Sequence, residues 1–235
     1  MCPIFDGSIL KGVHVMEMMI LGLILFLGGH SIGMFAPGWR MRKIEQVGRN
    51  AYRGIYATLA LIGISLIVKG HDNALESLTW GWTPPVFTKH ISVLLMLFAL
   101  IMLVSTYVPN NHIKAKLKHP MILSVIVWAL AHFIANGEGA NVILFGSFLI
   151  WAILNFRFAR QRDRLALEAT AKDAPIVDLP INTSFARTLT CLVLGLVIWV
   201  VMVAYLHNLL FGVYPIVIPG LMGPIPAAGA VVMPT

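Results

Sequence analysis

Residues 188–211 read TLTCLVLGLVIWVVMVAYLHNLLF, and this stretch decides the fold class because it contains no Asp, Glu, Lys or Arg. A helix that crosses a bilayer needs about 20 largely apolar residues. Apolar side chains here would cover most faces of the helix rather than one stripe, which is typical of a segment that does not face water. The stretch therefore predicts a transmembrane helix.

The rest of the chain has the same character. Of its 235 residues, 58% are hydrophobic and 11% are charged, and the mean hydropathy is +0.84, which is far from the usage of soluble domains. Further apolar runs occur at about Val15–Phe35, Gly54–Val68, Val86–Val108, Pro120–Asn136 and Asn141–Phe156, of which the second and the last are short. We predict an all-α, polytopic membrane bundle of six transmembrane helices in contact with the lipid bilayer.

The basic residues predict how this bundle is oriented. Fourteen of the 17 lysines and arginines fall in alternate connections, at residues 40–53, 114–118 and 157–187. The positive-inside rule places these connections on the cytoplasmic side, so both termini are expected outside, N-out and C-out. Although the net charge of +7 would suit a nucleic-acid-binding protein, this distribution favours membrane topology and contact with anionic lipid head groups instead.

The chain divides into a transmembrane domain at 1–217 and an apolar, Pro/Gly-rich C-terminal tail at 218–235. The tail cannot form a regular spanning helix because prolines interrupt it. Charge and proline between Arg157 and Arg187 predict a polar connector. No short apolar segment with a small-residue cleavage site precedes the first predicted crossing, so we expect a retained N-terminal anchor. Cys2 and Cys191 should lie near opposite membrane faces, which argues against a disulfide between them.

Two histidines fall deep in apolar segments. His30 lies late in the first predicted crossing, and His132 lies 12 residues after Pro120, about 18 Å along a helix and near mid-membrane. An interhelical hydrogen bond is the plainer explanation for each. However, two imidazoles on separate helices, each one turn after an aromatic residue (Phe26 and Trp128), also suit haem ligation within a bundle.

Residues near these histidines permit further interpretations. Gly29 and Gly33 form a small-xxx-small pair beside His30 that would allow close helix approach. A zinc site could combine His30 and His132 with the boundary histidines His71 and His119, although their expected depths differ. The sequence contains no C-x-x-C-H, H-E-x-x-H, P-loop or dinucleotide-binding pattern. No inverted repeat supports a transporter.

Five segments in this order resemble the NnrU family of bacterial membrane proteins. They are GGHSIGMF (28–35), IEQVGRNAYRGIYATLALIGISLIVKGHD (44–72), LKHPMILSVIVWALAHFIANGEG (117–139), FGSFLIWAI (145–153) and HNLLFGVYP (207–215). A distant relative of that family is 15-cis-zeta-carotene isomerase, a haem b enzyme. The resemblance implies a multi-pass protein of the bacterial inner (cytoplasmic) membrane.

The resemblance also implies site residues. The haem-ligating histidines would be His30 and His132, and two further family histidines fall on His71 and His119. The isomerase has a cysteine three residues before its second ligand, where this chain has Ala129, and this departure argues against ligand switching here. The family motif GRNAYRGIY carries Arg49 and Arg53, which would bind either haem propionates or lipid phosphates.

Two functions follow from this resemblance. The first is a haem b membrane protein linked to nitric oxide and nitrite metabolism in denitrification, or to redox isomerisation of a lipophilic small molecule. The second is a non-enzymatic assembly or accessory factor whose histidines only pack helices. Whether the chain is an enzyme, with isomerase-like or redox activity, is left open between them.

Overall fold

The computed structural model describes residues 7–78, 80–173 and 182–216, and within these ranges the chain is helical apart from loops and one isolated β-bridge. The helices are α1 (Gly7–Phe35), α2 (Pro37–Val47), α3 (Arg49–Ser77), α4 (Val86–Tyr107), α5 (His112–Leu117), α6 (Pro120–Ala135), α7 (Gly139–Asp173), α8 (Phe185–Val201), the π-helix η1 (Met202–Leu206) and α9 (His207–Phe211). The predicted all-α class is confirmed.

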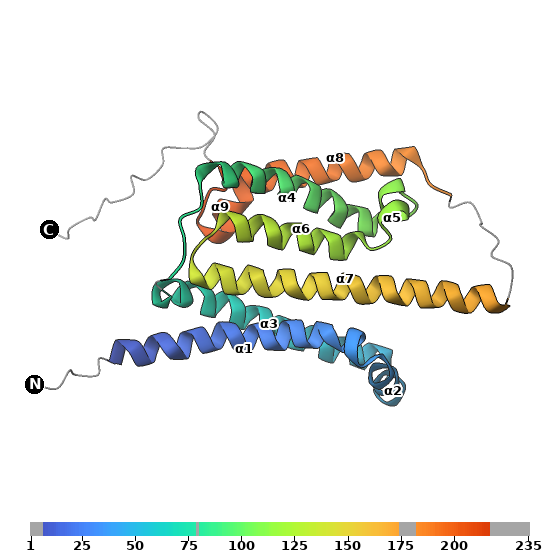
Figure 1. The fold of residues 1–235 in the computed structure, drawn as a ribbon, viewed down its shortest axis with the longest axis horizontal. Coiled ribbons are helices and arrows are strands. Elements are labelled where there is room, and N and C mark those ends of the chain that lie inside the picture. The colour runs from blue at the N-terminus through green and yellow to red at the C-terminus, as the bar shows by residue number, and fades with distance from the viewer. Residues whose placement is uncertain (1–6, 79, 174–181, 217–235) are drawn as a thin grey trace, which may run out of the picture.

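The long helices form two groups with α7 between them. Figure 1 shows α1 beside α3 on one side of α7, and α6, α4 and α8 on the other. Helix α1 packs mainly against α3, whereas α4 packs against both α6 and α8. Helix α7 contacts α6, α1 and α3, so it joins the two groups into one bundle.

Glycines allow α1 and α3 to approach closely, but they are not the ones that the sequence predicted. A Cβ atom added at Gly22 would lie 2.7 Å from the carbonyl oxygen of Gly63 on α3. At Gly29 and Gly33, by contrast, an added Cβ would meet no atom within 4 Å. The predicted close contact at Gly29 and Gly33 is therefore wrong, because the two backbones meet farther toward the start of α1.

The loop before α4 is tied to the turn between α6 and α7. The N–H of Trp82 donates to the carbonyl oxygen of Gly137 over 3.1 Å, and the N–H of Gly139 donates to the carbonyl oxygen of Trp80 over 3.0 Å. An added Cβ at Gly137 would overlap the Trp82 carbonyl, so this close crossing requires glycine. These bonds anchor the end of α6 that carries His132.

Two predicted crossings were too short, and part of the predicted connector after Arg157 is helical. Helix α3 begins at Arg49, and α7 continues from its apolar part through RQRDRLALEATAK to Asp173. This segment is rich in Arg, Leu and Ala, which have high helix propensity. Arg164 and Glu168 also form an i,i+4 ion pair at 3.6 Å. Helix α7 therefore continues without interruption from an apolar into a charged segment.

In the described part of the chain, five helices are long and apolar enough to cross a membrane. The fourth predicted crossing corresponds to α6, which is apolar but has 16 residues, or about 24 Å of helix. The sixth crossing and the orientation of the termini therefore stay predictions. The chain is a multi-pass helical membrane protein.

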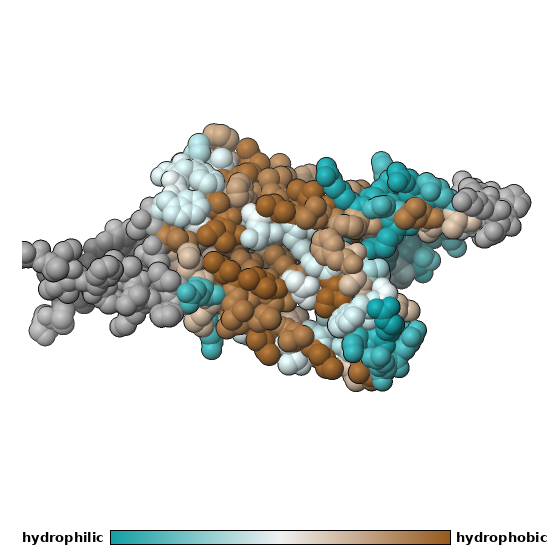
Figure 2. Space-filling view, turned by 60° about the horizontal axis from the view of Figure 1, so that its bottom comes forward, coloured by the Kyte–Doolittle hydropathy of each residue, from teal (hydrophilic) through white to brown (hydrophobic). Residues whose placement is uncertain are grey.

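Apolar and hydrophilic side chains occupy different parts of the surface along the bundle axis. Figure 2 shows apolar side chains over the middle of the molecule and hydrophilic ones gathered at one end, where Figure 1 places α2, α5 and the end of α7. Large apolar residues such as Ile24, Leu61 and Ile150 are 62%, 65% and 64% exposed, as expected for side chains that face lipid. The three basic segments lie together at the hydrophilic end, which we call the basic end.

Candidate functional site

His30 lies near the basic end of α1, and one of its ring nitrogens is held by the helix itself. The Nδ1–H donates to the carbonyl oxygen of Phe26 over 2.7 Å. A carbonyl oxygen only accepts, so the lone pair of the neutral ring is on Nε2. The rings of Phe26, Tyr56 and Trp151 surround the imidazole at centroid distances of 4.3, 5.0 and 6.1 Å. His30 is thus oriented with a nitrogen that can bind a metal.

A cavity of about 650 Å³ opens beside His30, and we call it the His30 pocket. It is formed by α1, α2, α3 and α7, and Gly29 and Gly33 form part of its wall. The absence of side chains at these glycines leaves space there, which explains their position next to the histidine. The sequence had suggested a helix contact instead.

The wall of the His30 pocket carries positive charge without a balancing carboxylate. Arg40, Arg53 and Arg162 line it, and no Asp or Glu is among its lining residues. Arg40 lies 5.8 Å from the ring centre of Tyr52, and Arg162 donates to the carbonyl oxygen of Gly33 over 3.3 Å. The pocket therefore suits an anionic group next to a metal-binding nitrogen.

The predicted pair Arg49 and Arg53 is divided by the structure. Arg53 lines the His30 pocket, whereas Arg49 begins α3 outside the lining. Arg40 and Arg162 take part instead, although their positions in the sequence indicated only the membrane topology. Their joint position arises because α2 and the charged part of α7 meet at the basic end, which no local spacing reveals.

His132 lies in the last turn of α6, which ends at Ala135. Its Nδ1–H donates to the carbonyl oxygen of Trp128 over 2.9 Å, so Nε2 carries the lone pair, as in His30. The ring centroids of Trp128 and Phe145 lie 5.3 and 4.8 Å away. The aromatic surroundings predicted for this histidine are present.

The ring beside His132 is that of His207, which was not among the site residues predicted from the sequence. Their centroids are 6.4 Å apart and their planes differ by 19°. His207 begins α9 directly after the π-helix η1, and its Nδ1–H donates to the carbonyl oxygen of Val213 over 2.7 Å. The motif HNLLFGVYP was the signal that could have identified this residue.

His30 and His132 belong to different surroundings. Their ring neighbours are connected through Phe148, which lies 5.7 Å from Phe26 and 5.3 Å from Trp128. His132 does not line the His30 pocket. Joint ligation of one iron by both imidazoles therefore stays a prediction, whereas one histidine ligand together with arginines for carboxylates fits the His30 pocket.

His71 and His119 use Nε2, the nitrogen that His30 and His132 leave open, to join helices. His71 donates to Oδ1 of Asn141 on α7 over 2.8 Å. His119 donates to Oδ2 of Asp163, also on α7, over 2.9 Å. These contacts account for both side chains as connections to α7. Within the described ranges, no group of three or more His, Cys, Asp or Glu could hold a metal ion, so a zinc site gains no support.

Ala129 and Cys191, which the sequence analysis discussed, are both buried. Ala129, where the isomerase has cysteine, is fully buried in α6. Cys191 is a free, buried thiol in α8. Cys2 lies outside the described residues, as does the tail from residue 217 onward.

Comparison with known proteins locates the chain in one family. Neither the curated proteins nor the solved structures give a match. A family model described as NnrU protein matches residues 18–215, which include the His30 pocket and the His132–His207 pair. The match covers most of the chain, and the chain belongs to the NnrU family.

Proposed function

We propose that this protein binds haem b in the His30 pocket. One observation supports the proposal above all: a cavity of about 650 Å³ combines an imidazole whose Nε2 is open with three arginines and no carboxylate. Haem is a flat apolar ring with a metal at its centre and two carboxylates at its edge. A pocket that offers a metal ligand, aromatic rings and guanidinium groups has matching chemistry.

The chain's own residues would have separate roles in this site. The Phe26 carbonyl holds the His30 ring so that Nε2 faces away from its own backbone. Arg40, Arg53 and Arg162 would bind the propionates, and the rings of Tyr52 and Tyr56, which line the pocket, would supply apolar surface. Bound haem would provide an iron centre for electron transfer or for binding a small ligand.

We place this activity in nitric oxide and nitrite metabolism, following the family resemblance. Redox isomerisation of a lipophilic substrate is the less favoured reaction because Ala129 supplies no thiol for ligand exchange. We expect no change in carotenoid isomers when the protein is expressed with cis-carotenoid precursors, as measured by chromatography of the extracted pigments. A shift from cis to trans products would contradict this expectation.

The visible spectrum of the purified protein tests haem binding. Protein made with ample haem and purified in detergent should show a Soret band, and His30→Ala should remove most of it. His132→Ala is the matched control, because it removes an imidazole that makes the same kind of Nδ1–H hydrogen bond but does not line the pocket. A colourless but folded wild-type protein, or a band lost in His132→Ala and kept in His30→Ala, would contradict the proposal.

A pair of arginine variants tests the same pocket at its charged wall. Arg53→Gln should weaken haem retention, by about tenfold if one charge-assisted hydrogen bond of about 1.5 kcal/mol is lost. Arg49→Gln changes the charge equally, four positions earlier on α3, and should leave retention unchanged. Equal effects of the two substitutions would show that general charge, rather than the pocket, controls haem content.

The second candidate function is a non-enzymatic accessory factor. It is favoured by the contacts His71–Asn141 and His119–Asp163, in which family histidines connect helices through hydrogen bonds from Nε2. The same spectrum separates the two functions, since a purely structural role requires no absorbing cofactor.

A further inference from the structure

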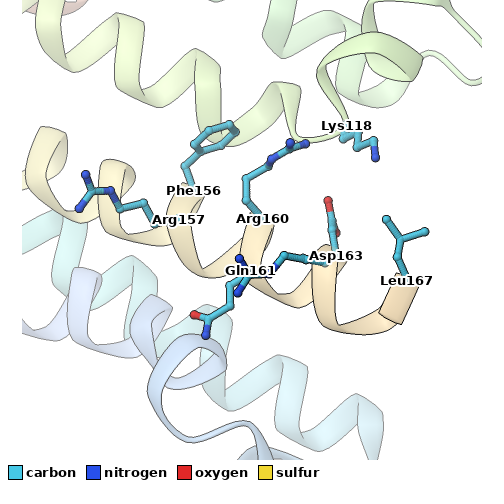
Figure 3. A pocket seen from close by; sticks show the side chains of 8 residues that line it. Lys118, Phe156, Arg157, Arg160, Gln161, Asp163 and Leu167 are labelled. Carbon is cyan, nitrogen blue, oxygen red and sulfur yellow. The ribbon is translucent and has the colours of Figure 1, made fainter. Parts of the chain in front are cut away.

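A second cavity lies at the basic end, along the charged part of α7 (Figure 3). It has a volume of about 550 Å³ and lies between α7 and the turn that joins α5 to α6. In Figure 3, Phe156, Arg160 and Asp163 project from α7 toward the turn that carries Lys118. We call this cavity the α7 pocket.

Positive charge dominates the α7 pocket. Lys118, Arg157, Arg160 and Arg164 line it together with a single carboxylate, that of Asp163. Asp163 accepts a hydrogen bond from His119 over 2.9 Å, so part of its capacity to bind the neighbouring cations is already used. The pocket keeps an excess of positive charge.

Two of these cations are available for an external partner. Among the described residues, Arg157 and Arg160 form no ion pair, whereas Arg164 is paired with Glu168 at 3.6 Å. Lys118 is held by the turn with φ of 63°, a conformation that residues other than glycine rarely adopt. Its N–H donates to the carbonyl oxygen of Lys114 over 2.9 Å, which fixes the turn next to the pocket.

The α7 pocket lies where the apolar part of α7 meets its charged part, a position that suits a lipid head group. The apolar part of α7 ends at Phe156, and the charged sequence RFARQRDR follows from Arg157. Phe156 and Leu167 both line the pocket, so apolar surface lies next to the guanidinium groups. Arginine binds phosphate oxygens in a bidentate manner, and basic pockets between membrane helices bind anionic head groups.

We propose that the α7 pocket binds the phosphate group of an anionic phospholipid, with Arg157, Arg160 and Lys118 as its ligands. Free inorganic phosphate offers the same anion without acyl chains. The apolar wall favours the lipid, since it would contact the glycerol and the first methylenes. This proposal is independent of haem binding.

The test measures lipid binding to the full chain in detergent, by native mass spectrometry and by the shift in melting temperature. Dioleoyl phosphatidylglycerol should bind and stabilise the protein, whereas dioleoyl phosphatidylcholine and millimolar inorganic phosphate should do so far less. Arg157→Gln combined with Arg160→Gln should weaken phosphatidylglycerol binding by about tenfold or more. Both side chains are exposed, so the variant should keep the wild-type circular dichroism.

The control is Lys116→Gln combined with Arg187→Gln, which removes two exposed charges at the basic end but none from the pocket lining. It should bind phosphatidylglycerol like the wild type. Equal weakening in both double variants would overturn the proposal, because it would show a general charge effect. Stabilisation by inorganic phosphate as large as that by the lipid would overturn the assignment to a phospholipid.

Discussion

The two nitrogens of each imidazole separate the family histidines into two kinds. In His30 and His132, Nδ1 is bonded to a carbonyl of the same helix, so Nε2 is left with the lone pair. In His71 and His119, Nε2 donates to a side chain of α7. In the second kind Nε2 is occupied by the contact with α7 and the lone pair of the neutral ring is on Nδ1. Of the four histidines, only His30 lines the His30 pocket.

A double-mutant cycle at His71 and Asn141 tests whether a histidine that donates to α7 stabilises the bundle. Asn141 is buried, and its amide also donates to Glu138 over 2.9 Å, so the contact belongs to a small network. We expect a coupling energy of about 0.6 kcal/mol and at most about 1.7 kcal/mol, as for other hydrogen bonds between membrane helices. The measurement is unfolding of the single and double variants in mixed micelles.

His71→Ala should also leave the Soret band unchanged, because the ring has a protein partner. Additive effects of the His71 and Asn141 substitutions would contradict the structural role of this contact. Loss of the Soret band in His71→Ala would make His71 part of the haem site.

At the scale of elements, the contact between α1 and α3 depends on glycines, which have no side chain to hold the helices apart. Gly22 and Gly63 let the backbones approach, and beside them Met19, Leu23 and Ile67 form part of the buried core. Larger residues at the contact would separate the helices, and α1 carries His30. Packing of this pair therefore holds one wall of the His30 pocket.

Substitution of glycine by alanine should have opposite effects at two positions of α1. Gly22→Ala should lower the free energy of unfolding by about 1–3 kcal/mol, since its Cβ would meet Gly63 and Ile67 at 2.7 Å. Gly28→Ala should be neutral or stabilising by up to about 1 kcal/mol, because nothing lies within 4 Å and alanine favours helix.

Thermal unfolding of both variants in detergent provides the comparison. Equal stability of Gly22→Ala and Gly28→Ala would mean that the helices separate without cost, contrary to the packing described above.

At the scale of the whole molecule, α7 joins two helix groups and carries charge well past its apolar part. The basic end collects α2, α5 and this extension, and both basic pockets open there. Positive charge at one end is what a cytoplasmic face requires. The short helix α6 then decides whether the chain crosses the membrane five or six times.

Cysteine labelling tests the predicted sixth crossing. In a background that replaces Cys2 and Cys191, Lys116→Cys before α6 and Glu138→Cys after it should react from opposite sides of the membrane. A membrane-impermeant maleimide applied outside should label only Glu138→Cys, in line with the predicted N-out, C-out topology. Labelling of both positions from one side would make α6 a helix that does not cross.

The amino-acid sequence by itself determined the class of the molecule. Apolar runs long enough to cross a bilayer can only satisfy their backbone groups as helices, so composition and run length indicate a helical membrane protein. Alternation of charge between the runs likewise predicted which connections gather at one end. The helical turn also placed Phe26 and Trp128 beside their histidines, because residues four apart share a face.

Only the tertiary structure decided which residues meet across helices. The rotation and depth of each helix depend on packing, and packing paired His132 with His207 and gave His30 to a pocket with Arg40, Arg53 and Arg162. Apolar residues occur on most faces of these helices, so no stripe in the sequence indicates which face turns toward a neighbour. For this reason the fold class could be predicted from the sequence, whereas the partners within each site could not.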